Sequence, residues 1–136
     1  MIVLTVDEIV LLHGKLLRAT GGTPGLRDPG LLESAVLGVN AGFGDSERYP
    51  TVEAKAARLA FALVNNHAFV DDNKRVGMLA MLMLLGLNNV TLCYTQKELI
   101  KLGLDIASGL AKYEDILDWI IRHRNPPLKP SEQNSQ

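Results

Sequence analysis

The feature that most restricts the fold of this chain is a pair of mostly apolar stretches, residues 52–64 and 76–87, with a polar cluster between them. The first stretch is apolar on nearly every side of a helix, and the second is apolar almost throughout, so both are expected in the core. The cluster, residues 67–75, contains a histidine, two carboxylates, an amide and two cations. Because polar groups between buried helices are costly unless they are satisfied, the cluster predicts a functional site.

Start and stop signals predict further helices on both sides of this pair. Thr5 with Glu8, and Thr95 with Glu98, have the spacing of capping boxes. Asp28 precedes a proline, which is favoured at the first helical position. Six helices are expected, at about residues 5–21, 28–39, 51–66, 73–87, 95–109 and 113–124.

The connecting segments are short. Residues 40–50 are polar and rich in glycine, which predicts a loop or a short hairpin, and residues 90–94 predict a short extended piece. We expect one domain over residues 1–124 and a disordered polar tail over residues 125–136.

Composition narrows the classes of protein. A formal net charge of −1 argues against a broad nucleic-acid-binding surface or a polybasic membrane patch. The single cysteine excludes a cluster of thiolate metal ligands and suits a reducing compartment. No signal peptide is visible, and the most apolar stretch is shorter than the roughly 20 residues that span a bilayer. We therefore expect a cytoplasmic protein with no direct contact to nucleic acid or membrane.

The residue types of the cluster favour phosphate chemistry. Lys74 and Arg75 fall in the first turn of the second central helix, where cations are mildly unfavourable and anions bind, so an external phosphate is expected. His67 can act as a general base because imidazole is mostly neutral at pH 7. Asp71 or Asp72 could hold magnesium against phosphate oxygens. Such a set is typical of phosphoryl or nucleotidyl transfer.

Each of these residues also has a purely structural explanation. His67 would cap the end of one helix, Asp71 and Asp72 would cap the start of the next, and Lys74 and Arg75 would be solvated charges. For one residue alone that explanation is the simpler one. For all of them within one short cluster, the functional explanation is favoured.

Other candidates carry less weight. His13 and His123 are expected to be helix-surface or capping residues, and Phe69 and Val70 are expected to anchor the loop in the core. Neither a Walker-type phosphate loop nor a G-x-G-x-x-G motif is present.

The cluster matches a known pattern, H-x-F-x-D-x-N-K-R, at residues 67–75. It resembles the signature of the Doc (death-on-curing) toxins, a branch of the Fic fold. Residues 24–35 and 49–51 resemble that family as well, and the similarity extends over roughly residues 4–124. The resemblance implies an all-α, Fic-type helical bundle whose active loop joins the two central helices. A flap at roughly residues 42–49 would precede these helices and align the target peptide.

The resemblance also implies roles for the residues of the cluster. His67 would deprotonate a hydroxyl group of a protein substrate, and Asp71 would bind Mg²⁺. Asn73, Lys74 and Arg75, together with backbone amides, would bind the phosphates of ATP. Asp72 is assigned to the same group of ATP-binding residues. The catalytic residues implied are His67, Asp71, Asn73, Lys74 and Arg75.

Two positions separate this chain from the relatives that transfer AMP, which carry G-N-G-R-x-x-R. Lys74 stands at the second glycine and Met78 at the second arginine. Doc-like proteins share the lysine and pass the γ-phosphate of ATP to a threonine of elongation factor Tu, which blocks translation. The resemblance thus implies a protein kinase that is the toxin of a toxin–antitoxin system. AMP transfer, an inactive nucleotide- or antitoxin-binding module and a metal-dependent phosphohydrolase are the alternatives.

Some features depart from the family pattern. Ala68 replaces a usual proline, and Asp72 replaces a usual glycine or alanine. A carboxylate at position 72 would repel phosphates, cap the helix or add a metal ligand. No self-inhibitory [S/T]-x-x-x-E-[G/N] motif is found, so restraint is expected from a cognate antitoxin whose C-terminal segment covers the active site. Phe43 and the apolar face around Trp119 are the expected contacts.

Overall fold

In the computed structural model the chain forms helices and one minimal hairpin, and the structure describes residues 1–40, 42–43 and 46–127. For residues 42–43 and 46–47 it describes the backbone alone. The helices of this described part are α1 (Val6–Thr20), α2 (Pro29–Val39), α3 (Val52–Asn66), α4 (Asn73–Leu87), α5 (Gln96–Ala107) and α6 (Tyr113–Arg122). Strands β1 (Gly42–Phe43) and β2 (Ser46–Glu47) pair antiparallel between α2 and α3. The expected all-α fold is confirmed, and residues 40–50 contain the short hairpin.

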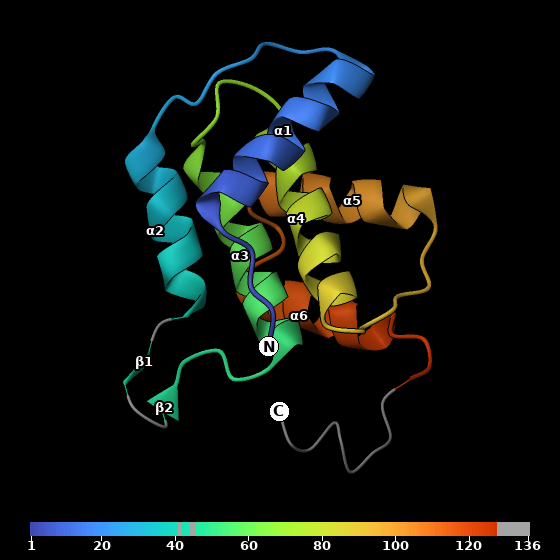
Figure 1. Ribbon diagram of the computed structural model, residues 1–136. Helices are drawn as coiled ribbons and strands as arrows, with labels where there is room; N and C mark the ends of the chain where they lie inside the picture. Colours follow the sequence, from blue (N-terminus) through green and yellow to red (C-terminus); the bar gives the residue numbers. More distant parts are fainter. Residues whose placement is uncertain (41, 44–45, 128–136) are drawn as a thin grey trace.

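Helices α3 and α4 lie at the centre of the molecule and pack along each other (Figure 1). Helix α3 also contacts α2, α5 and α6, whereas α1 and α5 cover α4. The two central helices approach closely at Gly77, where a Cβ atom would lie 2.7 Å from the side chain of Val64. The two apolar stretches of the sequence are therefore the two core helices, and the polar cluster joins them at one end of the molecule.

The helices begin where the capping signals predict. Thr5 and Thr95 form the two expected capping boxes. The carboxylate of Asp28 caps α2 by accepting a hydrogen bond from the Leu31 N–H, and Thr51 caps α3 in the same way. These side chains satisfy N–H groups that have no partner within their own helix.

The last helix ends at Arg122 rather than near residue 124. His123 caps it, and the chain then turns to pair with the predicted extended piece, where Leu92 bridges Arg124. The N–H of Cys93 donates to the carbonyl of His123 at 2.7 Å. This pairing removes the residues after position 122 from the helix.

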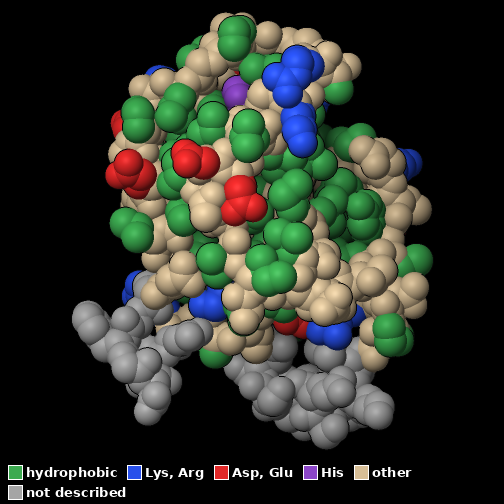
Figure 2. Space-filling view, viewed as in Figure 1, with side chains coloured by type: hydrophobic (Ala, Val, Ile, Leu, Met, Phe, Trp, Pro, Cys, Tyr) green, Lys and Arg blue, Asp and Glu red, His purple; other side chains and the backbone are tan. Residues whose placement is uncertain are grey.

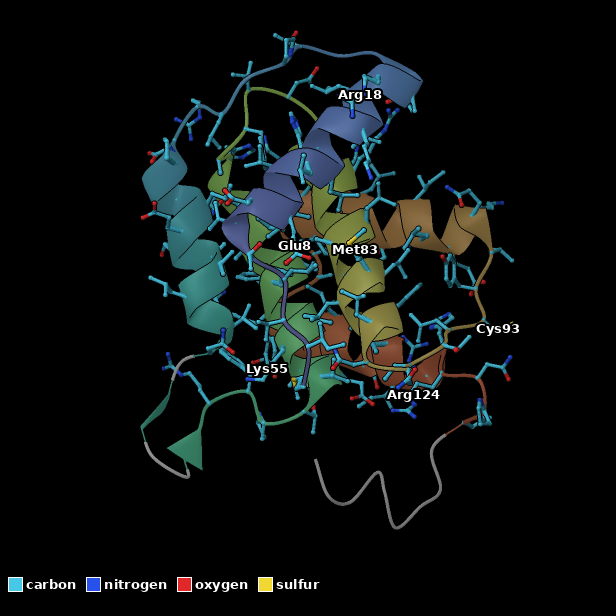
Figure 3. All side chains as sticks on the ribbon, in the orientation of Figure 1. Glu8, Arg18, Lys55, Met83, Cys93 and Arg124 are labelled. Carbon is cyan, nitrogen blue, oxygen red and sulfur yellow. The ribbon has the colours of Figure 1, made fainter. Side chains whose placement is uncertain are left out.

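An ion pair fixes this C-terminal segment to the core. Arg124 binds the carboxylate of Glu53, in the first turn of α3. Glu53 is buried, and a buried charge needs a partner. Figure 3 shows Arg124 and Lys55 at the end of the molecule opposite to the α3–α4 loop.

Two placements of apolar side chains differ from the prediction. Trp119, at the centre of the apolar face that was expected to contact a partner, is buried and stacks on the ring of His123 with centroids 4.1 Å apart. Val70, expected in the core, is 51% exposed. The expected contact at Phe43 involves a side chain outside the described residues.

Exposed apolar side chains gather instead over α4 and α5, as Figure 2 shows. Those exposed on these two helices are Met83, Leu87, Ile100 and Leu104. Within the described ranges, none of the helices combines the length and apolarity of a membrane crossing.

Candidate active site

The loop between α3 and α4 starts and ends on residues with unusual backbone. His67, at the C-cap of α3, has φ 53°, and Asp72, at the N-cap of α4, has φ 62°. This left-handed conformation costs a non-glycine residue roughly 1–2 kcal/mol, although His and Asp adopt it more readily than most. Strain of this kind persists only where surrounding contacts fix the backbone. The loop should therefore be held by strong contacts, and three sets of them are present.

The first set lies within the loop itself. Phe69 is almost fully buried, as predicted for a core anchor. The side-chain amide of Asn73 accepts a hydrogen bond from the Phe69 N–H at 3.0 Å and donates one to the Phe69 carbonyl at 2.9 Å. Asn73 is buried, so its amide is used to close the loop on itself. Its predicted contact with phosphate stays a prediction.

The second set comes from residues 22–28, which we name the strap segment. It runs alongside the loop, with Leu26 in a bridge to Phe69. The Val70 N–H donates to the Gly25 carbonyl at 3.0 Å, and the Arg27 N–H donates to the Ala68 carbonyl at 2.7 Å. The strap segment thus covers one edge of the loop between α3 and α4, which we name the active loop.

Arg27 and Gly22 adapt the strap segment to this position. The Arg27 Nε atom donates to the carbonyl of His67 at 2.7 Å, which fixes the left-handed residue at the helix end. Gly22 has φ 120°, and a Cβ there would lie 2.9 Å from Oδ2 of Asp72. Only glycine permits this close passage of the strap segment over the loop.

The third set is a single side chain from α1. His13 is 4% exposed, and its Nε2 atom lies 2.8 Å from the carbonyl oxygen of Asp71. Its ring stacks on Phe69 with centroids 3.9 Å apart. The prediction of a surface or capping role for His13 is wrong. One signal pointed to burial: His13 follows the buried Ile9 by four positions, so both lie on the same face of α1.

The carboxylate of Asp71 accepts hydrogen bonds from two backbone N–H groups. Its Oδ2 atom accepts from the Thr23 N–H at 3.1 Å, and its Oδ1 atom accepts from the Asp72 N–H at 2.8 Å. These two N–H groups hold the pKa of the Asp71 carboxyl below its usual value, and charge at His13 and Arg75 acts in the same direction. The group is therefore a carboxylate at neutral pH.

The surroundings of Asp71 fit magnesium that arrives together with phosphate. Each of its carboxylate oxygens has one hydrogen bond, which leaves a second lone-pair direction free. Magnesium is usually held by one or two carboxylates, with phosphate and water oxygens completing its shell. No group of three or more His, Cys, Asp or Glu side chains with metal-binding geometry occurs in the described part of the chain.

The side chain of Asp72 does not cap α4 in the way that was expected. It occupies the N-cap position of α4, but its side chain makes no capping hydrogen bond. Its Oδ2 atom is buried without a partner among the described residues, and its Oδ1 atom lies 4.0 Å from Nη1 of Arg75. Asp72 therefore adds negative charge beside a predicted phosphate-binding cation.

The two cations border an apolar hollow of about 420 Å³ between α1, α4 and α5. The stem of Lys74 packs against Gly103 of α5, while the guanidinium of Arg75 remains exposed. The other lining residues are mostly apolar: Leu16, Thr20, Met78, Leu79, Gln96, Leu99 and Ile100. His67 does not line this hollow; it is exposed, and its imidazole has no hydrogen-bond partner within the described ranges.

The hairpin lies far from this site. It precedes α3 and His67 follows α3, so a helix of 15 residues, about 22 Å long, separates them (Figure 1). The expectation that residues 42–49 align a target beside His67 is therefore wrong for strands β1 and β2. The segment that borders the active loop is the strap segment.

Comparison with known proteins agrees with this architecture. Residues 3–85 match the model of the Fic/DOC family. The chain is 30% identical to the "Protein kinase doc" of Escherichia phage P1 over 116 residues. This aligned region covers 85% of this chain and 90% of that protein. It is also 41% identical to the "Toxin Doc" of Mycolicibacterium smegmatis over 85 residues. This aligned region covers 62% of this chain and 64% of that protein. The family match includes α1, the strap segment, the active loop and nearly all of α4, and the chain is therefore a Doc-type member of the Fic/DOC family.

Proposed function

We propose that this chain is a toxin that transfers the γ-phosphate of ATP to a hydroxyl group of a protein. The observation that carries the proposal is the active loop. Here His67, exposed and without a side-chain hydrogen bond to the described residues, and an ionised Asp71 precede two cations on the first turn of α4. The similarity to a protein named as a kinase and to one named as a toxin supports the same activity.

The residues divide the work of the reaction. The target hydroxyl oxygen attacks the γ-phosphorus, its proton passes to the imidazole of His67, and ADP leaves as the β–γ bridging bond breaks. Asp71 would hold magnesium, which neutralises charge on the phosphate oxygens. Lys74 and Arg75 would bind the phosphates as cations. Asn73 would act through the loop geometry that its amide maintains.

The strap segment is the proposed support for the target. It lies beside His67, and Leu26 at its centre is partly exposed. A peptide that lies along residues 22–28 would bring a hydroxyl group to the exposed imidazole. A threonine of elongation factor Tu is the proposed acceptor, and its phosphorylation would block translation.

The proposed partner is a cognate antitoxin whose C-terminal segment covers the active site. The apolar hollow beside Lys74 and Arg75 suits an amphipathic helix with acidic residues near the two cations. This hollow, and not the face around Trp119, is the proposed contact surface for the antitoxin.

The test is a paired label-transfer assay. Purified protein, magnesium and elongation factor Tu are mixed with ATP labelled at the γ- or the α-phosphate. We expect transfer of the γ label, lost in His67→Ala and retained in the neighbouring control Asn65→Ala. Asn65 is exposed, and its side-chain amide donates to the Phe61 carbonyl within α3. Transfer of the α label would mean AMP addition. Binding of ATP with transfer of neither label would mean either a different target protein or an inactive binding module silenced by Asp72, and Asp72→Gly separates these two.

A further inference from the structure

His13 is a buried titratable residue that the proposed reaction does not use. The carbonyl oxygen of Asp71 can only accept, so the Nε2 atom of His13, 2.8 Å away, carries a hydrogen and donates it. The imidazole is fixed in this orientation because it stacks on the buried ring of Phe69, with the two planes 13° apart. The donor is therefore rigid and aimed at one peptide group.

That peptide group, which joins Asp71 to Asp72, is held at both ends. Its carbonyl accepts from His13, and its N–H donates to Oδ1 of Asp71 at 2.8 Å. A flip of the peptide would break both hydrogen bonds. It would also carry φ of Asp72 from 62° to about −120°, which takes the residue out of the left-handed region that is costly for a residue with a side chain.

The strain at Asp72 thus favours the flip, and the hydrogen bond from His13 opposes it. We propose that His13 is a positioning residue that keeps the Asp71–Asp72 peptide unflipped and thereby directs the Asp71 carboxylate. In the unflipped state Oδ2 of Asp71 is held by the Thr23 N–H of the strap segment. The part of this inference that concerns magnesium rests on the proposed function, whereas the part that concerns the peptide does not.

Three variants separate the donor from the ring. His13→Phe keeps the stack on Phe69 but removes the hydrogen, and His13→Gln keeps an amide donor without the ring. Asp72→Gly, combined with His13→Phe, removes most of the strain that drives the flip, because glycine adopts positive φ freely. Thermal unfolding of each variant shows whether it is folded.

The first readout is independent of activity. Backbone NMR couplings and NOEs at Asp72 report φ, and we expect His13→Phe to shift them to the flipped values. His13→Gln should keep the wild-type values, and Asp72→Gly should restore an unflipped loop in the double variant. Wild-type values at Asp72 in a folded His13→Phe protein would overturn the inference, whether or not the chain transfers phosphate.

The second readout concerns magnesium. In the presence of ATP, we expect His13→Phe to weaken the apparent magnesium affinity about 10- to 100-fold, as when partners of metal ligands are lost, and His13→Gln to recover most of it. A flipped peptide in His13→Phe with unchanged magnesium affinity would contradict the role of Asp71 in the proposed function and leave the role of His13 in the loop intact. If His13→Phe does not fold, His13→Leu, which also removes the donor and leaves Asp72 unchanged, takes its place in both readouts with the same expected and contradicting results.

Discussion

At the scale of single residues, Asp72 is in an unfavourable environment. It combines a left-handed backbone, a buried carboxylate oxygen without a partner in the described structure, and a place next to Arg75. An unsatisfied buried acceptor costs about 1–3 kcal/mol, and the left-handed conformation adds to this cost. The residue destabilises the fold, and its charge would oppose an anion bound beside Arg75.

We therefore expect Asp72→Gly to raise the free energy of unfolding by about 1–2 kcal/mol, after the greater flexibility of unfolded glycine is subtracted. The same change should tighten ATP binding, since it removes a negative charge 4.0 Å from Arg75. Chemical denaturation and calorimetric titration measure the two effects. Asn89→Gly is the matched control: Asn89 also has positive φ, 64°, but lies after α4, so only stability should change.

Residue-level signals in the sequence predicted local structure well and long-range contacts poorly. Capping side chains such as Thr5 and Asp28 act within four positions, so their partners are visible in the sequence. His13 acts across 58 positions and Arg27 across 40, and no local pattern contains such partners. The cluster at residues 67–75 was found because its residue types are unusual between apolar helices, yet the buried, bonded amide of Asn73 became visible only in three dimensions.

At the scale of elements, the contact between α3 and α4 depends on Gly77. A Cβ there would meet the Val64 side chain at 2.7 Å, which is too close for any real contact. Gly77→Ala should therefore lower the free energy of unfolding by about 1–3 kcal/mol through overpacking. Gly86→Ala, in the same helix but with nothing within 4 Å, should raise it by up to about 1 kcal/mol. Urea denaturation of both variants tests this pair. An equal change in the free energy of unfolding would mean that α3 and α4 can move apart at Gly77 without cost.

Helices α5 and α6 are linked through Glu98 and His123. The hydrogen bond to His123 at 3.0 Å and the capping bonds of Thr95 lower the pKa of Glu98 from 4.5 to about 2. Because the folded pKa is depressed, the stabilisation is present above pH 4.5 and is lost as pH falls from about 4.5 to about 2. Glu98→Gln should flatten the dependence of the melting temperature on pH in this window. A slope equal to that of the wild type would contradict the link.

At the scale of the whole molecule, the candidate site and the ion pair that holds the C-terminal segment lie far apart. The active loop, the strap segment and His13 lie at one end, and the Glu53–Arg124 ion pair lies at the other (Figures 1 and 3). Arg124→Met leaves Glu53 charged and buried, so we expect a loss of about 3–5 kcal/mol in the free energy of unfolding. Below its melting temperature the variant should bind ATP as the wild type does, by calorimetric titration. Adding Glu53→Met should restore much of the stability, since the pair is then apolar.

Because of the strap segment, different parts of the molecule should open at different temperatures on heating. One of the three sets of contacts that hold the active loop consists of a few hydrogen bonds from an exposed connection between α1 and α2. Exposed connections open at lower free energy than core helices. Such openings would leave α3 and α4 intact while the loop relaxes, so heat should inactivate the protein several degrees before its helices melt.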